Sequence, residues 1–449
     1  LRMRGEVNMK IRITRRNFLK TAGAVAATAS AMGMLTACGG GGGTPSNSNG
    51  GSTNGNGGNN GETPDDPSNG DGGNGQEEII ETNWLYFPER DGTATISGYN
   101  GTLEANVVVP EKIGKYSIVT IGGMAGSNTM VTLTLPASIK TVYTYGFEFC
   151  KSLEHISFSE GLETIMGCAF QGCSALKEIN LPNSVKSIEL GAFRDCKKAK
   201  TLSLPAKLDY IPIDAFQNTA IEEVTIPASV TLVDGMAFAD NRNLKTVRFL
   251  GKTKFSTENE QNGYQFRGCE SLEDVVLPDE TERIEEGMFA NCDSLKGFKF
   301  PSKLKTIEDM AFMNSGLTMA SLPTGVTKIG EAAFANSQLI EISLPQGLKE
   351  IGASAFGFTN LVTAAIPDGI KEIQESTFAN CRDLKSVYLP ASVRSIEKSA
   401  FESCYFLQNV YYGGSAENWK QIKIAGKNEA LEQAELHENA SPAQMPQIF

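Results

Sequence analysis

Short apolar alternations recur along most of the chain, as in Leu176, Ile179 and Leu181. Alternation with a period of two predicts a short strand with one buried face. A proline usually follows, and because it cannot donate to a ladder it is expected to end the strand. A second apolar pair, such as Val185 and Ile188, comes next. The prolines of this column are Pro136, Pro182, Pro205, Pro227, Pro278, Pro301, Pro323, Pro345, Pro367 and Pro390.

A phenylalanine closes each of these units, usually 22 or 23 residues after the previous one. A fixed period in this range predicts a stacked-repeat protein, in which each unit buries its apolar side against the next copy. The Ala-Phe pair of each unit is expected to lie in one short helical turn. The phenylalanines are Phe147, Phe170, Phe193, Phe216, Phe238, Phe266, Phe289, Phe312, Phe334, Phe356, Phe378 and Phe401.

Three residues after each phenylalanine stands a small residue that can hydrogen-bond, which predicts a buried local partner for backbone groups of a turn. Cysteine, serine, threonine and asparagine are expected to replace one another freely there. Because the column is not restricted to cysteine, we predict buried reduced thiols in preference to disulfides or metal ligands. The cysteines of this ladder are Cys150, Cys173, Cys196, Cys269, Cys292, Cys381 and Cys404.

The three columns together resemble the BspA-like (Treponema-type) leucine-rich repeat, over about twelve copies. The resemblance implies an α/β solenoid, mainly β by content. In this family a right-handed superhelix carries a parallel β-sheet on one face and short strands and helical turns on the other. It also implies a bacterial surface protein, and some members of the family bind host matrix or plasma proteins or other bacteria.

The first 37 residues are expected to be a lipoprotein signal peptide of the twin-arginine type. Thr14-Arg15-Arg16-Asn17-Phe18 resembles the twin-arginine motif, with Arg15 and Arg16 as its defining pair. An apolar run follows and ends in Leu35-Thr36-Ala37-Cys38-Gly39, which resembles a bacterial lipobox. The resemblance implies a lipid on Cys38, which would hold the exported protein at the membrane and the cell surface.

Composition divides the rest of the chain. We expect a lipidated Cys38 with a disordered Gly/Asn-rich tether over 38–76, and an N-terminal β cap with a degenerate repeat over 77–129, in which Gly126 stands where phenylalanine belongs. The array then covers 130–412, and a C-terminal cap and tail cover 413–449. The formal net charge of −12 argues against nucleic acid, whose binding depends on cationic contacts to phosphate.

No catalytic set is apparent in the sequence. Only two histidines occur, His155 and His437, and no Cys-x-x-Cys pair or phosphate-binding glycine loop accompanies them. Acidic pairs such as Glu285-Glu286 and Glu308-Asp309 could act as glycosidase carboxylates, but a solvated face explains them more simply. We therefore predict no enzyme activity, no cofactor and no metal.

The outward positions of the first strand predict a flat strip of small, hydroxylated side chains instead of a pocket. Arg248 and Lys299 bracket Val276 as a basic spot on an acidic protein, and Tyr388 and Tyr411 should lie side by side. These four residues are the candidate partner-binding positions. A lipid-anchored monomer that binds another protein, as in adhesion, is the favoured interpretation. A structural envelope spacer without a ligand is the alternative, and a carbohydrate-binding or carbohydrate-processing protein is less favoured.

Overall fold

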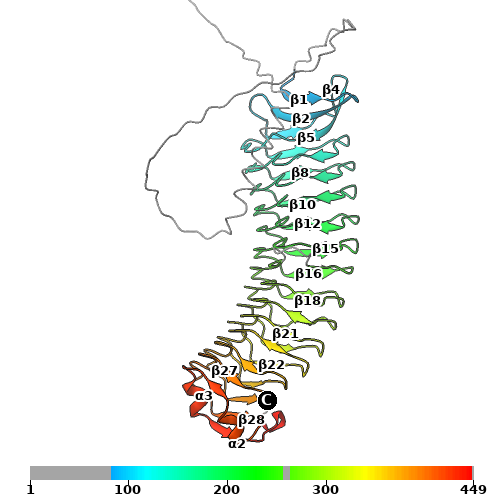
Figure 1. The fold of residues 1–449 in the computed structure, drawn as a ribbon. Helices are drawn as coiled ribbons and strands as arrows, with labels where there is room; N and C mark the ends of the chain where they lie inside the picture. The colour runs from blue at the N-terminus through cyan, green and yellow to red at the C-terminus, as the bar shows by residue number, and fades with distance from the viewer. Residues whose placement is uncertain (1–81, 256–262, 447–449) are drawn as a thin grey trace, which may run out of the picture. The chain divides into compact units, whose positions relative to one another are not determined.

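The structure is a computed structural model that describes residues 82–255 and 263–446. These residues form a mainly β solenoid of about 15 turns, stacked one on another (Figure 1). A typical turn of the array contains two short strands, followed by a hydrogen-bonded turn that carries the phenylalanine. Lipidation at Cys38 and the export pair Arg15 and Arg16 lie outside the described residues.

The first strand of each turn stacks into a column that we call the first strand column. Its strands run parallel and usually contain three or four residues with the middle side chain buried. They are β3 (Asn106–Val108), β6 (Thr132–Thr134), β8 (His155–Ser157), β10 (Glu178–Asn180), β12 (Thr201–Ser203), β14 (Glu223–Ile226), β16 (Thr246–Phe249), β17 (Asp274–Val276), β20 (Met319–Ser321), β22 (Glu341–Ser343), β24 (Thr363–Ala365), β26 (Ser386–Leu389), β28 (Asn409–Tyr412) and β30 (Glu435–His437).

The second strand of each turn stacks into the second strand column, where most strands have only two residues. The second residue of each pair points inward, as Ile188 and Ile351 do. The strands are β5 (Tyr116–Ile121), β7 (Thr141–Val142), β9 (Thr164–Ile165), β11 (Ser187–Ile188), β13 (Tyr210–Ile211), β15 (Leu232–Val233), β18 (Arg283–Ile284), β19 (Thr306–Ile307), β21 (Lys328–Ile329), β23 (Glu350–Ile351), β25 (Glu372–Ile373), β27 (Ser395–Ile396) and β29 (Lys423–Ile424).

Neither column is one continuous sheet. The first column is divided into β3-β6-β8, β10-β12, β14-β16-β17, β20-β22 and β24-β26-β28-β30. The second column is interrupted between β11 and β13. In the turn of β11, the Glu189 N–H donates to the Ile165 carbonyl of the turn before. The equivalent residue in the turn of β13 is Pro212, which has no N–H to donate. At Gly297 no strand forms in the first column, in keeping with the weakness of glycine inside strands.

The phenylalanines stand in a single file, which confirms the central prediction from the sequence. All twelve rings are completely buried, and neighbouring ring centroids lie between 5.3 and 5.8 Å apart. The interplanar angles run from 3° to 21°, so every ring except the two at the ends, Phe147 and Phe401, stacks on the rings of both adjacent turns. A continuous aromatic interior thus runs through the array.

The segment around each phenylalanine is not helical, which corrects the expected helical turns. Residues two before and two after the phenylalanine take positive φ, as Gly191 (60°) and Asp195 (61°) do around Phe193. A left-handed residue cannot continue a right-handed helix. Alternate N–H groups instead bond within the turn, as Arg194 does to Gly191, or to the next turn, as Phe193 does to Ala215.

The first described residues form a hairpin of β1 (Trp84–Pro88) and β2 (Thr93–Tyr99), and β2 pairs in parallel with β5. A two-residue strand, β4 (Lys112–Ile113), pairs antiparallel with β5. In the degenerate repeat Met124, not Gly126, takes the place of phenylalanine. The Met124 carbonyl accepts from Cys150 Sγ at 3.2 Å, as the Phe147 carbonyl does from Cys173 Sγ.

The last turns end in two short helices, α2 (Ala416–Trp419) and α3 (Glu429–Gln433), and the 3-10 segment η1 (Pro442–Gln444). Ser415 is the N-cap of α2, and its Oγ accepts from the Asn418 N–H at 3.4 Å. Trp419 packs edge-on against the buried Tyr412, with ring centroids 5.2 Å apart. Within residues 82–255 and 263–446, no helix has the length and apolar character needed to cross a membrane.

Candidate partner-binding surface

The outer face of the first strand column carries the basic spot that the sequence predicts. Arg248 on β16 lies directly beside Val276 on β17, and Lys299 holds the same place in the following turn. Arg248 and Lys299 are exposed, and neither forms an ion pair with any described residue. Free guanidinium and ammonium groups on an acidic protein can attract an anionic partner.

Apolar side chains accompany these cations. Val276 is 52% exposed and Met319, on β20, is 60% exposed. Between their turns lies Gly297, where an added Cβ atom would meet no atom within 4 Å. The face is therefore shallow and partly apolar here, with a cation on each side of Val276.

The two tyrosines at the other end of this face lie side by side, as the sequence predicts, but one of them is buried. Tyr388 and Tyr411 are register partners on β26 and β28, but Tyr388 is only 6% exposed. The reason lies at Gly413, where an added Cβ would come within 2.7 Å of the Tyr388 hydroxyl, so the ring occupies space that a side chain would fill. Burial also raises the pKa of Tyr388.

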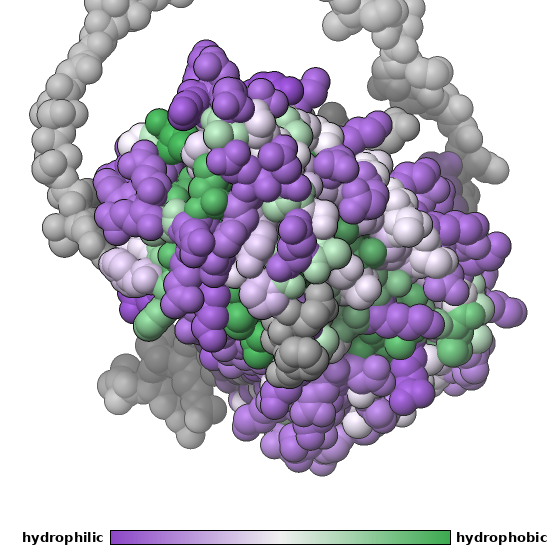
Figure 2. Space-filling model, turned by 90° about the horizontal axis from the view of Figure 1, so that it is seen from below, coloured by the Kyte–Doolittle hydropathy of each residue, from purple (hydrophilic) through white to green (hydrophobic). Residues whose placement is uncertain are grey.

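Tyr411 instead stacks on His437 of β30, with ring centroids 4.6 Å apart, and His437 Nε2 lies 2.8 Å from Asn409 Oδ1. Nearby in sequence, the exposed aromatic pair Tyr405 and Phe406 takes the place of residues that are mostly polar in other turns. Figure 2 shows hydrophobic surface among hydrophilic side chains at this end of the molecule. The pair is visible in the sequence, because only here do two aromatic residues directly follow the ladder residue.

His155 has a neighbour that reading one strand at a time misses. Its Nδ1 lies 3.4 Å from Glu178 Oε1, which belongs to the next turn, and both side chains are nearly half exposed. Residues at equivalent positions of adjacent turns face each other across parallel strands. The pair is therefore found by aligning successive repeats, not by examining the sequence of one strand. The geometry is that of an exposed ion pair.

The acidic pairs considered as catalytic carboxylates are held in structural contacts. Arg283 Nε lies 3.0 Å from Glu285 Oε2 and 3.3 Å from Glu308 Oε1, and Glu285 is only 3% exposed. Asp309 accepts from the Glu331 N–H at 2.8 Å. Within the described residues, no group of three or more His, Cys, Asp or Glu side chains is arranged to hold a metal ion.

The cysteine ladder links each turn to the one before it. Each ladder thiol donates to the carbonyl that precedes it by one turn, as Cys173 does to Phe147 (3.1 Å) and Cys196 to Phe170 (3.4 Å). The same bond recurs at Cys269, Cys292, Cys381 and Cys404. All eight cysteines in the described part of the chain are free and buried.

The residue in this column depends on the length of the repeat, contrary to the expected free substitution. Every ladder cysteine before Cys404 stands in a turn whose next phenylalanine comes 23 residues later, whereas serine and threonine stand where the spacing is 22. The shorter hydroxyl side chains of Ser337 and Thr359 bond to the phenylalanine carbonyl of their own turn, both at 2.7 Å. In these two 22-residue repeats the side chain therefore satisfies a carbonyl of its own turn, where a ladder cysteine satisfies one of the preceding turn.

The described thiols should be almost unreactive in the folded protein. All eight thiols are buried, and burial raises the pKa of Cys168 and of Cys381 to about 11 each, whereas the hydrogen bond with Cys173 lowers the pKa of the fully buried Cys150. The thiolate is the reactive form, and it must also be accessible to react. In a Cys38→Ser variant, titration with an aromatic disulfide reagent should detect fewer than one thiol per chain at neutral pH. After unfolding without reductant it should detect all eight. Fewer than eight would indicate disulfides, and rapid reaction of several in the folded state would contradict the burial.

Comparison with known families decides the class of this solenoid. The model for the BspA type leucine-rich repeat region matches residues 124–245, 259–384 and 311–430 in six copies, which covers well over half of the chain. The chain belongs to the BspA-type leucine-rich repeat family. The model for the twin-arginine translocation signal matches residues 12–32 of this leucine-rich repeat protein, which indicates export.

Solved leucine-rich repeat structures are similar to this one along most of its length. A leucine-rich cell-surface protein from Faecalibacterium prausnitzii shares 24% identity, covering 76% of this chain and 96% of that one, with a TM-score of 0.47. A leucine-rich repeat protein from Bacteroides ovatus shares 23%, covering 80% and 99%, with 0.48. The pneumococcal vaccine antigen PcpA shares 22%, covering 81% and 97%, with 0.49. No curated protein matches the chain significantly.

Proposed function

We propose that this leucine-rich repeat protein is a non-catalytic surface protein that binds another protein through the outer face of its first strand column. The observation that supports it most directly is the exposed pair Arg248 and Lys299 on either side of the exposed Val276. An apolar centre flanked by unpaired cations suits a protein surface that presents carboxylates around an apolar side chain. Host matrix proteins, plasma proteins and the surfaces of other bacteria are the partner classes to examine.

The proposal includes the organisation expected from the sequence. Residues 1–37 would direct export, Cys38 would carry a lipid, and 38–76 would hold the array away from the membrane. Residues 77–129 and 413–449 would cover the two ends of the repeat array over 130–412, since an uncovered solenoid end exposes apolar surface. The coil would be right-handed, which is the hand of nearly all parallel-strand crossovers. The protein would act as a monomer.

Tyr411 is a second candidate contact, now together with His437, whereas the buried Tyr388 would act by supporting its neighbour. Aromatic side chains are frequent in interface hot spots. A Tyr411→Ala variant that retains full binding to a partner would restrict the interface to the basic spot.

Charge reversal at the basic spot should weaken binding by at least tenfold. The purified protein would first be screened against matrix proteins, plasma proteins and cell-surface glycans, and any partner measured with the Arg248→Glu/Lys299→Glu variant. Reversal replaces attraction to the partner's carboxylates with repulsion. Lys198→Glu/Arg382→Glu, at exposed positions away from the spot, is the matched control and should change the affinity less than twofold. If no protein in the screen bound, the spacer interpretation would be favoured.

A further inference from the structure

Two consecutive turns of the array are joined by no strand pairing. The turn of β22 and β23 is followed by the turn of β24 and β25, and neither strand column forms a paired ladder across this junction, although the Val362 N–H just before β24 donates to the Ile340 carbonyl at 3.2 Å. At every other junction between successive described turns, at least one strand column remains paired. We call the gap between β23 and β25, which residues between Lys349 and Gln374 line, the open junction.

The open junction is a wedge and not a break in the array. On the side of the phenylalanines the turns remain joined, since the Ser354 N–H donates to Glu375 at 2.9 Å and the Phe356 N–H to Thr377 at 3.0 Å. The rings of Phe356 and Phe378 also stay stacked at 5.5 Å. The gap therefore opens on the side of the second strand column, between β23 and β25.

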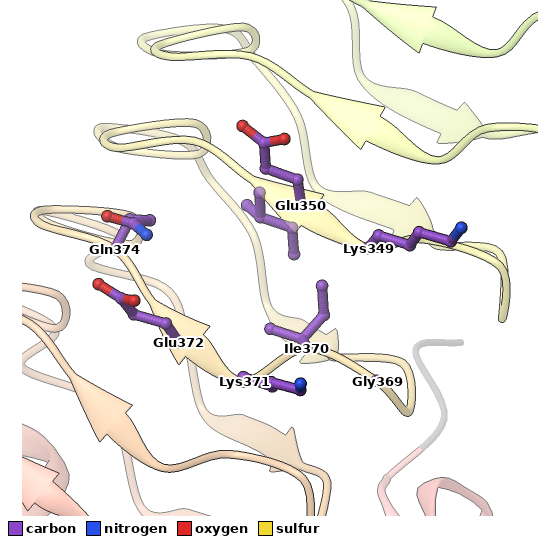
Figure 3. A pocket seen from close by; sticks show the side chains of 8 residues that line it. Lys349, Glu350, Gly369, Ile370, Lys371, Glu372 and Gln374 are labelled. Atoms are coloured by element: carbon purple, nitrogen blue, oxygen red, sulfur yellow. The ribbon is translucent and has the colours of Figure 1, made fainter.

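A cavity of about 430 Å³ fills this gap between β23 and β25. Its walls include Lys349 and Glu350 from one turn, and Lys371, Glu372 and Gln374 from the next (Figure 3). The backbone edges of both strands face the cavity without a partner strand. An unpaired strand edge is a template for the addition of another strand.

The charges at the open junction are arranged differently from those of other junctions. At two paired junctions of this column a lysine meets a glutamate of the adjacent turn: Lys186 meets Glu163 and Lys305 meets Glu282, each at 2.7 Å. At the open junction the dipeptide Lys-Glu is repeated, so lysine follows lysine and glutamate follows glutamate. Like charges in facing positions on adjacent strands are destabilising, and here two such pairs act together. A single like-charged pair, Lys371 and Arg394 across the paired strands β25 and β27, does not open the next junction.

We propose that the open junction binds an extended peptide segment in which an acidic residue directly precedes a basic one. The segment would lie between β23 and β25 as an added strand, with hydrogen bonds from its backbone to both edges. Its carboxylate would lie between the ammonium groups of Lys349 and Lys371, and its cation between the carboxylates of Glu350 and Glu372. The protein thereby has a second binding site, on the opposite column from the basic spot.

The chain itself shows that a segment of this order fits the column. Glu282, Arg283 and Ile284 supply the acid, the base and the inward apolar residue in that order. The strand β18 formed there pairs in parallel with β19, and Glu282 contacts Lys305 of that next turn. A peptide with the order acid, base, apolar would present the same groups to the open junction.

Calorimetric titration of the full chain with the peptide acetyl-Thr-Glu-Arg-Ile-Glu-amide tests this proposal. We expect it to bind at least tenfold more tightly than acetyl-Thr-Arg-Glu-Ile-Glu-amide, in which only the order of the two charges differs. The variant Lys371→Glu/Glu372→Lys should lose binding at least tenfold, because each charge would then face an opposite charge and the strands would pair. Amide hydrogen exchange in β25 should slow in that variant.

A second variant separates the proposal from a simple folding defect. Adding Lys349→Glu/Glu350→Lys to the first pair restores like charges with the opposite order, and this fourfold variant should prefer the peptide with arginine before glutamate. Reversed preference would support the site. Equal affinity of the two peptides for the unmodified chain, no binding of either, or an unchanged preference in the fourfold variant would overturn the proposal.

Discussion

Replacement of Phe170 by alanine is expected to lower the free energy of unfolding by about 3–5 kcal/mol. The ring is completely buried, stacks at 5.3 Å on both Phe147 and Phe193, and has Phe158 edge-on at 5.8 Å. The cavity left behind cannot collapse easily, because backbone bonds such as that from Phe170 N–H to Ala192, at 2.8 Å, fix the spacing of the turns. Urea unfolding followed by circular dichroism measures the change.

The matched control is Phe406→Ala, which removes a ring that is 57% exposed. Its effect should stay within about 0.5 kcal/mol, as for most surface substitutions. Because repeat arrays can unfold in parts, both variants should also be compared by hydrogen exchange at adjacent turns. Equal destabilisation by the two substitutions would contradict the view that the stacked rings hold the turns together.

Asn241→Ala is the second substitution with a large expected effect, about 3–5 kcal/mol. Asn241 Nδ2 donates to the carbonyls of Phe216 (3.0 Å) and Phe238 (2.8 Å), and its Oδ1 accepts from the N–H of Thr219 (2.8 Å). The side chain thus joins two consecutive turns just before the longer repeat between Phe238 and Phe266. Alanine would leave the Phe216 carbonyl and the Thr219 N–H without this partner, and each unsatisfied buried group costs about 1–3 kcal/mol.

Two further variants divide this effect. Ser337→Ala removes a single hydrogen bond to Phe334 and should cost only about 1 kcal/mol. Asn241→Asp keeps the acceptor but removes both donors, so its cost should approach that of alanine. Thermal and urea unfolding would rank the stabilities of the three variants. If Asn241→Ala were no less stable than Ser337→Ala, the amide of Asn241 would be dispensable.

The repeat period was enough to predict the core. Phenylalanine at a fixed spacing, with apolar pairs between, can be buried in only one way when each unit is too small to bury itself. The period also locates the degenerate repeat, because a step of 23 residues back from Phe147 reaches Met124. The prediction that placed Gly126 at the phenylalanine position did not follow this step and is wrong. The period was therefore more reliable than the residue type.

The conformation of the turns could also have been read from the sequence. Asn, Asp and Gly dominate the position two residues after phenylalanine, as at Asp195, Asn218 and Gly268, and these residues tolerate positive φ. Tyr388 could not be placed in this way, because its burial depends on where the ring meets Gly413 across adjacent turns. The repeated Lys-Glu dipeptide was visible, but its effect depends on facing positions that one turn alone does not show.

The nearly equal spacing of the stacked rings has a consequence for how such a protein can change over generations. Since each turn contacts only its neighbours, whole repeats can be duplicated or lost in the gene without disturbing the interior. Every such event would alter the length of the stack by one strand spacing, about 4.8 Å. The length of the array can therefore change in steps of one turn while the residues at its two ends stay the same.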